Sequence, residues 1–134
     1  MPPVRVLVVD DNLLFLQAEI DLLTEEFDVV GSVSNGRSVL SAASELNPDV
    51  IVLDVSLGDM TGFEVARRLK SAGTTARIIF LTIHEGKEFV EAAMKLGAAA
   101  YVVKSQAAHD LPKAIVAAHQ GKTYYPPAAG RRGN

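Results

Sequence analysis

Five short apolar runs, rich in valine and isoleucine, recur along the chain, and each is followed by a longer stretch with helical periodicity. Runs of this kind suit the central strands of a parallel sheet, which are buried on both faces. Five strand-helix repeats predict a doubly wound α/β fold, flavodoxin-like, in which helices cover both faces of a five-stranded parallel sheet. The five runs are residues 4–9, 28–33, 50–53, 77–81 and 99–103.

Apolar residues three and four positions apart predict amphipathic helices between these strands. In the first helix this apolar stripe consists of Leu13, Leu16, Ile20, Leu23 and Phe27. Thr61 and Glu64 have the spacing of a capping box, which predicts that a helix begins after Thr61. The last helix lies within residues 109–120, and Pro112 belongs in its first turn, because deeper in the helix it would remove a hydrogen bond and clash. We expect one folded domain over residues 1–121 and a flexible tail or linker over residues 122–134.

Composition narrows the classes of protein that the chain can represent. Its 134 residues suffice for one domain with a real core, and 49% hydrophobic and 22% charged residues are ordinary for a globular protein. The formal net charge of −3 gives no support for a basic nucleic-acid or membrane binder. The absence of cysteine fits a reducing compartment. With no signal-peptide pattern and no apolar run long enough to span a bilayer, the predicted location is the cytoplasm.

Polar side chains follow the strongest strand runs at the point where each run ends. Asp10 and Asp11 follow the first strand, Asp54 the third and Thr82 the fourth, while Lys104 ends the fifth. Parallel strands align their carboxyl ends, and this edge is where open α/β sheets bind ligands. Gathered there, each pair of carboxylates would repel by roughly 4 kcal/mol at about 4 Å and an effective dielectric constant near 20. Such a cluster needs a cation, and oxygen ligands without histidine or cysteine favour Mg²⁺.

An acidic metal pocket that also holds a lysine and a hydroxyl group suits phosphoryl transfer. The metal and Lys104 would neutralise phosphoryl oxygens, and a carboxylate can act as the nucleophile. Asp54 is the natural nucleophile because it stands alone at the start of its loop. The pair Asp10 and Asp11 is better suited to holding the ion.

These residues, in this order and spacing, resemble the receiver domains of two-component response regulators. The matching elements are Asp10-Asp11, Leu53-Asp54, Thr82 and Tyr101-x-x-Lys104. The resemblance covers residues 4–121 and implies the strand order 2-1-3-4-5, for which a receiver protein is itself a standard example. Residues 97–105 look most like the LuxR/NarL-type subfamily, whose members usually carry a carboxyl-terminal helix-turn-helix and regulate transcription.

The resemblance implies a role for each acidic residue. Asp54 corresponds to the aspartate that accepts a phosphoryl group from a histidine kinase or a phosphotransfer protein. Asp11 corresponds to the direct ligand of Mg²⁺ (or Mn²⁺), with Asp10 supporting it. Asp54 and the backbone carbonyl of Ser56 complete the protein's share of the metal coordination.

The resemblance also implies a switch. Thr82 corresponds to the hydroxyl that bonds the phosphoryl group, and Lys104 to the lysine that pairs with it. Tyr101 corresponds to the aromatic residue that turns inward on activation. We expect the loops of Thr82 and Lys104 to shift, so that the surface of residues 82–104 changes and controls an output domain, a partner or a homodimer. The domain would then not be an enzyme, beyond phosphorylation from small donors and dephosphorylation of itself.

Three positions, Gly58, Ser56 and His84, are compared with those of the wider family. Gly58 lies where many receivers have proline, which predicts a looser loop after Asp54. Ser56 and His84 lie at positions that resemble the family's sites for tuning the phosphoryl lifetime, although His84 has an equally good interpretation as a solvated loop histidine.

Other functions are compatible with parts of this pattern. A phospho-independent interaction module could share the fold. An aspartyl phosphatase of the haloacid-dehalogenase type would need a second aspartate at position 56, where this chain has Ser56. A flavodoxin-like cofactor module would need a phosphate loop after the first strand, where Asp10 and Asp11 would repel phosphate. Nothing after Gly121 is long enough for a helix-turn-helix, so we expect no direct DNA binding by this chain, which would be a stand-alone receiver or one piece of a longer regulator.

Overall fold

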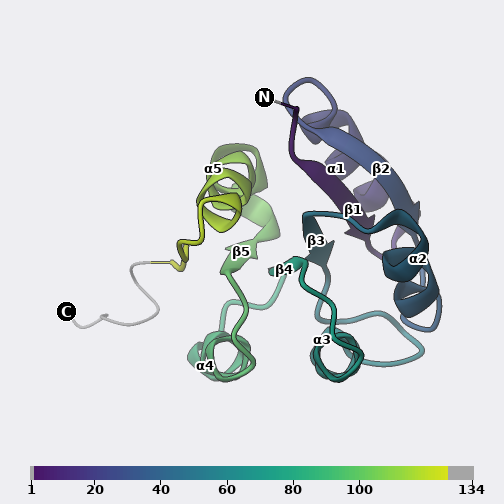
Figure 1. Cartoon of the computed structure of the whole chain (residues 1–134). Helices are drawn as coiled ribbons and strands as arrows, with labels where there is room; N and C mark the ends of the chain where they lie inside the picture. Colours follow the sequence, from purple (N-terminus) through teal and green to yellow (C-terminus); the bar gives the residue numbers. More distant parts are fainter. Residues whose placement is uncertain (1, 127–134) are drawn as a thin grey trace.

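The computed structural model describes residues 2–126 and has a parallel five-stranded sheet at its centre (Figure 1). The strands are β1 (Arg5–Val9), β2 (Asp28–Val33), β3 (Val50–Leu53), β4 (Arg77–Thr82) and β5 (Ala100–Val103). Their order across the sheet is β2-β1-β3-β4-β5. The predicted doubly wound fold and strand order are confirmed.

Helices cover both faces of the sheet, as Figure 1 shows. They are α1 (Leu13–Leu23), α2 (Val39–Leu46), α3 (Gly62–Ser71), α4 (Lys87–Lys95) and α5 (Ala107–His119), with a short 3₁₀ helix, η1 (Lys104–Gln106), before α5. One face is covered by α1 and α5, and the other by α2, α3 and α4. None of the helices within residues 2–126 is long and apolar enough to cross a membrane.

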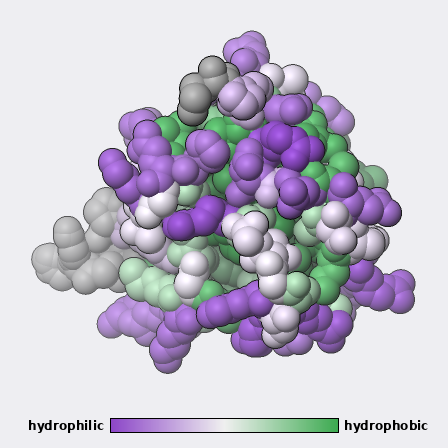
Figure 2. Space-filling view, viewed as in Figure 1, coloured by the Kyte–Doolittle hydropathy of each residue, from purple (hydrophilic) through white to green (hydrophobic). Residues whose placement is uncertain are grey.

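Alternation along the strands divides the core into two layers. In β1, Val6 and Val8 pack toward α1 and α5, whereas Leu7 and Val9 pack toward the other three helices. All four side chains are buried, as expected for a strand with neighbours on both sides and helices on both faces. Figure 2 shows hydrophilic residues over much of the visible surface, with smaller hydrophobic areas between them.

The first helix differs from its predicted apolar stripe at both ends. Asn12 caps α1, since its side chain accepts hydrogen bonds from the backbone N–H groups of Leu14 and Phe15. The first turn of α1 is nevertheless open to solvent, and Leu13 is 68% exposed. Phe27 is buried but lies beyond the end of the helix at Leu23. The prediction that both residues belong to one helical stripe was wrong.

Pro112 lies one turn deeper in the last helix than predicted. The helix begins at Ala107, directly after η1, so Pro112 follows a complete first turn. Proline removes one backbone hydrogen bond, to the carbonyl group four residues earlier. That carbonyl belongs to Ala108, an exposed residue, so water can satisfy it.

Helix α3 begins after Thr61, where the sequence placed it. The Thr61 side chain accepts a hydrogen bond from the Glu64 backbone N–H (3.1 Å). The Glu64 carboxylate instead pairs with Arg67 and Arg68 on the surface of the helix. Only the hydroxyl half of the predicted capping box is therefore formed.

After α5 the chain returns along the outer side of β5. Tyr124 donates its backbone N–H to the Ala99 carbonyl (2.9 Å) and accepts the backbone N–H of Tyr101 (3.1 Å). Its hydroxyl donates to Asp110 of α5, and the hydroxyl of Tyr125 donates to the Ala98 carbonyl. The segment that follows Gly121 is thus anchored to β5 at least as far as Tyr125, and the predicted tail continues through residues 127–134, which lie outside the described residues.

Candidate functional site

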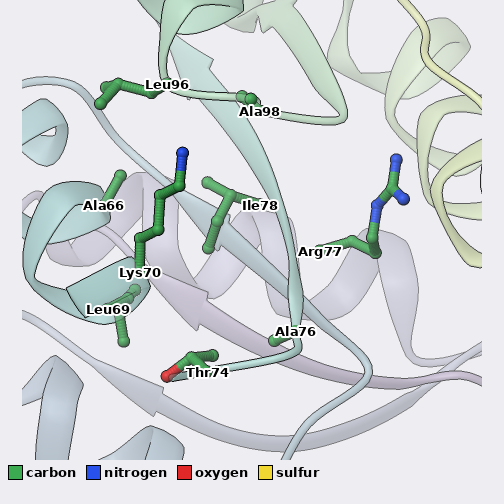
Figure 3. A pocket seen from close by; sticks show the side chains of 10 residues that line it. Ala66, Leu69, Lys70, Thr74, Ala76, Arg77, Ile78, Leu96 and Ala98 are labelled. Carbon is green, nitrogen blue, oxygen red and sulfur yellow. The ribbon is translucent and has the colours of Figure 1, made fainter. Parts of the chain in front are cut away.

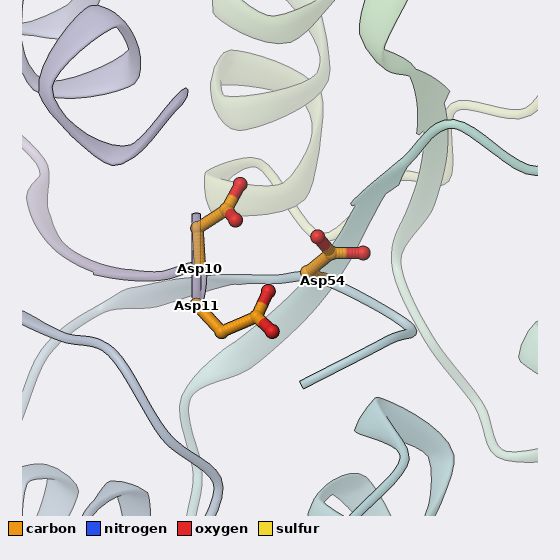
Figure 4. A group of neighbouring side chains, drawn as sticks. All are labelled: Asp10, Asp11 and Asp54. Atoms are coloured by element: carbon orange, nitrogen blue, oxygen red, sulfur yellow. The ribbon is translucent and has the colours of Figure 1, made fainter. Parts of the chain in front are cut away.

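Three carboxylates gather at the carboxyl ends of β1 and β3 (Figure 4). Val9 pairs with Leu53 in the sheet, which brings the residues that follow, Asp10 and Asp54, side by side. Oxygen atoms of Asp10, Asp11 and Asp54 all lie within 4.8 Å of one another. Asp10 and Asp54 are buried, whereas Asp11 is exposed.

Backbone groups hold the two buried carboxylates in place. Asp10 Oδ1 accepts the N–H of Asn12 (2.9 Å), and Asp54 Oδ1 accepts the N–H of Ser56 (3.1 Å). Each carboxylate therefore bonds the backbone two residues on, as aspartates do in tight turns. The sharp loops after β1 and β3 thereby fix the direction in which Asp10 and Asp54 point.

Lys104 reaches into this cluster from the end of β5. Its Nζ atom lies 2.7 Å from Asp10 Oδ2 and 2.8 Å from Asp54 Oδ2. The aromatic ring of Phe15 covers the ammonium group, with Nζ 4.2 Å from the ring centroid. Burial alone would lower the pKa of Lys104, but hydrogen bonds with Asp10 and Asp54 outweigh it and raise the pKa.

The charges of the cluster do not balance. Three carboxylates face one ammonium group, and Lys104 divides its charge between two of them. A divalent cation would complete the balance, and a donor set made only of oxygen atoms fits Mg²⁺ or Mn²⁺. The arrangement can therefore hold a hard metal ion next to a carboxylate that is also paired with a lysine.

Thr82 lies at the same edge of the sheet, at the end of β4. Its side chain is fully buried, and Oγ1 accepts a hydrogen bond from the His84 backbone N–H (3.4 Å). Because β4 is the neighbour of β3, the Thr82 hydroxyl and Asp54 end adjacent strands. The predicted residues Asp10, Asp11, Asp54, Thr82 and Lys104 thus occupy one edge of the sheet.

Tyr101 is connected to this edge through His84. The tyrosine side chain is buried, and its hydroxyl donates to the His84 carbonyl (2.8 Å). Burial, with smaller effects from Asp54 and Glu88, raises the pKa of Tyr101, so its hydroxyl remains a hydrogen-bond donor at neutral pH. The resemblance implies that Tyr101 turns inward on activation, and in this structure it already occupies an inward position.

His84 makes more contacts than a solvated loop histidine would. Its Nε2 atom lies 3.0 Å from Ser56 Oγ, and its ring stacks on Phe89 with centroids 4.5 Å apart. The residue therefore joins the loop after β4 to the loop after β3 and to α4. The sequence could not show this bridge, because it depends on two loops meeting in space.

The loop after Asp54 is tied at its middle. Asp59 accepts the backbone N–H groups of Gly36 (2.8 Å) and Arg37 (3.0 Å), both in the loop after β2. The hydrogen bond from Gly36 is the main reason why the pKa of Asp59 lies below its usual value. Gly58 has a φ of +80°, which glycine adopts at no steric cost. The looseness predicted from Gly58 is therefore countered by the next residue.

Glu19, on α1, is a neighbour of the site that the sequence did not predict. Its side chain is only 5% exposed, and it interacts with Asp10. Burial, followed by the interaction with Asp10, raises the pKa of Glu19 to about 9. Its spacing from Leu16 and Leu23 places it on the buried face of α1, but its polarity kept it out of the predicted apolar stripe.

Several surface grooves lie away from the acidic cluster. One, of about 250 Å³, is bordered by Lys70 of α3, Arg77 and Ile78 at the start of β4, and Leu96 and Ala98 (Figure 3). Arg77 and Ile78 stand at the amino end of β4, whereas Thr82 stands at its carboxyl end. The groove is therefore at the opposite edge of the sheet from Asp54.

Comparison with known proteins gives the class that this fold and site define. The model of the response regulator receiver domain matches residues 6–116, and the chain belongs to this family. It is 33% identical over 123 residues to the virulence factors putative positive transcription regulator BvgA of Bordetella pertussis. That match covers 91% of the chain but 59% of BvgA, so the chain spans little more than half the length of this relative.

Solved structures of receiver domains are similar over almost the whole chain. A LuxR-family two-component response regulator from Aurantimonas sp. SI85-9A1 has a TM-score of 0.89 and 28% identity, with 95% of this chain and 92% of that one covered. The isolated receiver domain of RcsB from Salmonella enterica serovar Typhimurium, in the presence of the phosphomimetic BeF3-, has a TM-score of 0.87 and 26% identity. The match covers 96% of this chain and 97% of the RcsB domain. The LuxR/NarL-type resemblance seen in the sequence is confirmed.

Proposed function

We propose that Asp54 accepts a phosphoryl group from a histidine kinase or a phosphotransfer protein, in a reaction that requires Mg²⁺. One observation carries this proposal: Lys104 bridges Asp54 and Asp10 within an oxygen cluster that Asp11 completes. The family supports a phosphorylation-dependent switch, and the cluster supports Asp54 as the acceptor within it.

The chemistry needs one nucleophile and compensation of charge. An oxygen of the Asp54 carboxylate attacks the phosphorus atom, a P–O bond forms and the bond from phosphorus to the donor's histidine nitrogen breaks, with its electron pair returning to the imidazole. Lys104 neutralises part of the charge on the transferred group. Mg²⁺, held by Asp10, Asp11, Asp54 and the Ser56 carbonyl, would supply further stabilisation of charge at the phosphoryl oxygens.

The switch depends on how far each partner must move. Lys104 already lies 2.8 Å from Asp54, so the expected shift of its loop is not needed for contact. Phosphorylation adds roughly −1.5 to −2 charge and three acceptor oxygens. The hydroxyl of Thr82, which accepts the His84 N–H, would then turn to donate its own proton to a phosphoryl oxygen, and this movement would exchange its contact with His84 for one with the phosphoryl group. That exchange loosens His84, and through it Tyr101, and so changes the surface of residues 82–104.

The output of the switch lies with a partner of the domain. We assign residues 1–121 to the receiver domain and residues 122–134 to a carboxyl-terminal tail or linker. BvgA is named a transcription regulator and is longer than this chain. A further neighbour is described as two RcsB dimers bound to two parallel DNAs. By analogy, the phosphorylated surface would promote a homodimer or control a DNA-binding domain, and the receiver itself would bind no DNA and catalyse no reaction beyond its own phosphorylation and dephosphorylation.

Intact-mass measurement after incubation with acetyl phosphate tests this function. With Mg²⁺, we expect the mass of one phosphoryl group to be added to the native chain. Chelation of the metal should abolish the addition, because the charge at the phosphoryl oxygens would no longer be compensated. Asp54→Asn should remove it as well. Asp21→Asn is the matched control, since Asp21 is an exposed aspartate on α1.

Other outcomes would reject the proposal. An adduct that persists in Asp54→Asn would place the acceptor elsewhere. Metal binding without transfer, from acetyl phosphate and from kinase donors alike, would indicate a phospho-independent interaction module. Rapid turnover of acetyl phosphate would indicate a phosphatase, although the position two residues after Asp54 holds Ser56, which has no carboxyl group to act as an acid.

A further inference from the structure

Phe15 is a half-exposed aromatic residue on the first turn of α1 and belongs to neither layer of the core. Its ring lies against the end of the Lys104 side chain, with Nζ 4.2 Å from the ring centroid. The face of an aromatic ring attracts a cation, most strongly where water has little access to the charge. The Lys104 side chain is only 9% exposed, so the contact is largely shielded from water. The ring therefore packs on the lysine and not on the core.

The position of Phe15 is set by the same loop that carries Asp10. Asp10 Oδ1 accepts the Asn12 N–H (2.9 Å), and Asn12 Oδ1 in turn accepts the Phe15 N–H (3.0 Å). Asp10 Oδ2 is paired with Lys104 (2.7 Å), on which the ring of Phe15 lies. These contacts form a closed circuit of four residues. The backbone of Phe15 is therefore held in a fixed place relative to the acidic cluster.

Lys104 needs support because of its own chemistry. Its ammonium group ends a flexible chain of four carbon atoms and carries three N–H donors. In the part of the chain that the structure describes, two carboxylates engage this group, Asp10 at 2.7 Å and Asp54 at 2.8 Å. Water at the remaining donor would draw the ammonium group away from Asp54. The ring of Phe15 is the third group against Nζ, and its face carries a partial negative charge but accepts no ordinary hydrogen bond.

We propose that Phe15 is a positioning residue, whose ring covers the Lys104 ammonium group, keeps water from it and holds it against Asp54. This inference rests on the proposed function in one respect, since it assigns the held ammonium group to the charge of the phosphoryl group. A cation that is already in place stabilises developing charge without having to reorganise. Phe15 acts through Lys104 and takes part in no bond that forms or breaks.

Two substitutions at this position separate the aromatic ring from a merely apolar cover. Phe15→Tyr keeps the ring, whereas Phe15→Leu keeps an apolar side chain without one. The intact mass of the full chain, followed over time with acetyl phosphate and Mg²⁺, gives the rate of phosphoryl addition. We expect Phe15→Leu to be about fivefold slower than the native chain, the size of one cation–π contact, and Phe15→Tyr to stay within about twofold. Leu14→Ala is the control, because it removes an 84% exposed side chain from the same turn and should leave the rate unchanged.

A second measurement needs neither metal nor acetyl phosphate. ¹³C relaxation of the Lys104 Cε group reports how freely the end of the side chain moves. We expect it to be restrained in the native chain and in Phe15→Tyr, and clearly more mobile in Phe15→Leu. Lys87, an exposed lysine on α4, gives the reference for a mobile side chain in the same sample.

Three results would overturn the role of the ring. Phe15→Leu would react at the native rate, or Phe15→Leu and Phe15→Tyr would slow the reaction equally, or Lys104 would become mobile in Phe15→Leu without any loss of rate. If the native chain accepted no phosphoryl group, the proposed function would fail. The mobility of Lys104 would then still decide whether Phe15 holds the ammonium group.

Discussion

The loops after β3 and β4 both border the acidic cluster, but they are held in different ways. The loop after β3 is held by hydrogen bonds to backbone groups: the Asp59 carboxylate accepts two N–H groups from the loop after β2, and the Gly62 N–H donates to the Val55 carbonyl (2.6 Å). The side chain of Thr61 then caps α3. The loop after β4 leads into α4 through Gly86, which offers no side-chain cap.

The loop after β4 depends largely on one residue. The backbone N–H of His84 donates to the Thr82 hydroxyl, and its carbonyl accepts the Tyr101 hydroxyl. Its ring bonds the Ser56 hydroxyl and stacks on Phe89. Phosphorylation of Asp54 would disturb these contacts or engage the same side chains in new ones. The chain therefore fixes the loop that carries Asp54, the proposed acceptor, and leaves the loop after β4 with contacts that can be replaced.

Paired glycine substitutions should give the largest contrast between the two loops. A Cβ atom at Gly62 would overlap the backbone carbonyl oxygen of Asp54, which cannot move without displacing that residue. We expect Gly62→Ala to cost about 3 kcal/mol in the free energy of unfolding. At Gly86 the nearest atom is the end of the flexible Glu88 side chain, 2.9 Å away, so Gly86→Ala should cost at most about 1 kcal/mol, for a poorer cap. Urea denaturation measures both, and similar losses would remove the contrast.

The tyrosine hydroxyl should matter next. Tyr101→Phe removes the donor to the His84 carbonyl and should cost about 1 kcal/mol. Amide hydrogen exchange in the loop after β4 should become faster, while the loop after β3 stays unchanged. Tyr125→Phe is the control, since it removes a similar bond to the Ala98 carbonyl without touching His84. Faster exchange in both variants would mean that β5, and not His84, controls the loop.

The tie made by Asp59 should depend on pH. Its pKa is lowered in the fold, so ionised Asp59 contributes stability above its ordinary value of 3.8, and this contribution is lost as the pH falls through the lower folded value. At neutral pH, Asp59→Ala should speed exchange of the Gly36 and Arg37 amides. The difference in stability from the native chain should shrink in acid. A difference that persisted at low pH would assign the effect to packing instead of charge.

The bridge between the two loops should have the smallest effect. Ser56→Ala removes the hydroxyl that contacts His84 Nε2, and both residues are open enough for water to replace the bond. We expect the free energy of unfolding to change by less than about 0.5 kcal/mol. A loss as large as that of Tyr101→Phe would show that the loops are held to each other more firmly than to their own strands.

The sequence was sufficient for the sheet and for the gathering of Asp10, Asp11, Asp54 and Lys104, because parallel strands share one edge. It failed where a side chain's environment depends on a distant element. Leu13 is exposed although it belongs to the predicted apolar stripe, and Glu19 is buried although it is polar, because the polarity of a residue alone does not fix its surroundings. No local pattern near His84 predicts its contact with Ser56, which lies 28 residues earlier in the chain.

Tyr124 also limits the pairing of β5 with other copies of the chain. β5 is an outermost strand, and such a strand presents free N–H and C=O groups to any other extended chain. Tyr124 occupies the Ala99 carbonyl and the Tyr101 N–H, so it acts as a short protective strand against pairing between molecules. A chain shortened to residue 121 would expose these groups, and its concentrated solutions should form β-rich aggregates more readily than those of the full chain.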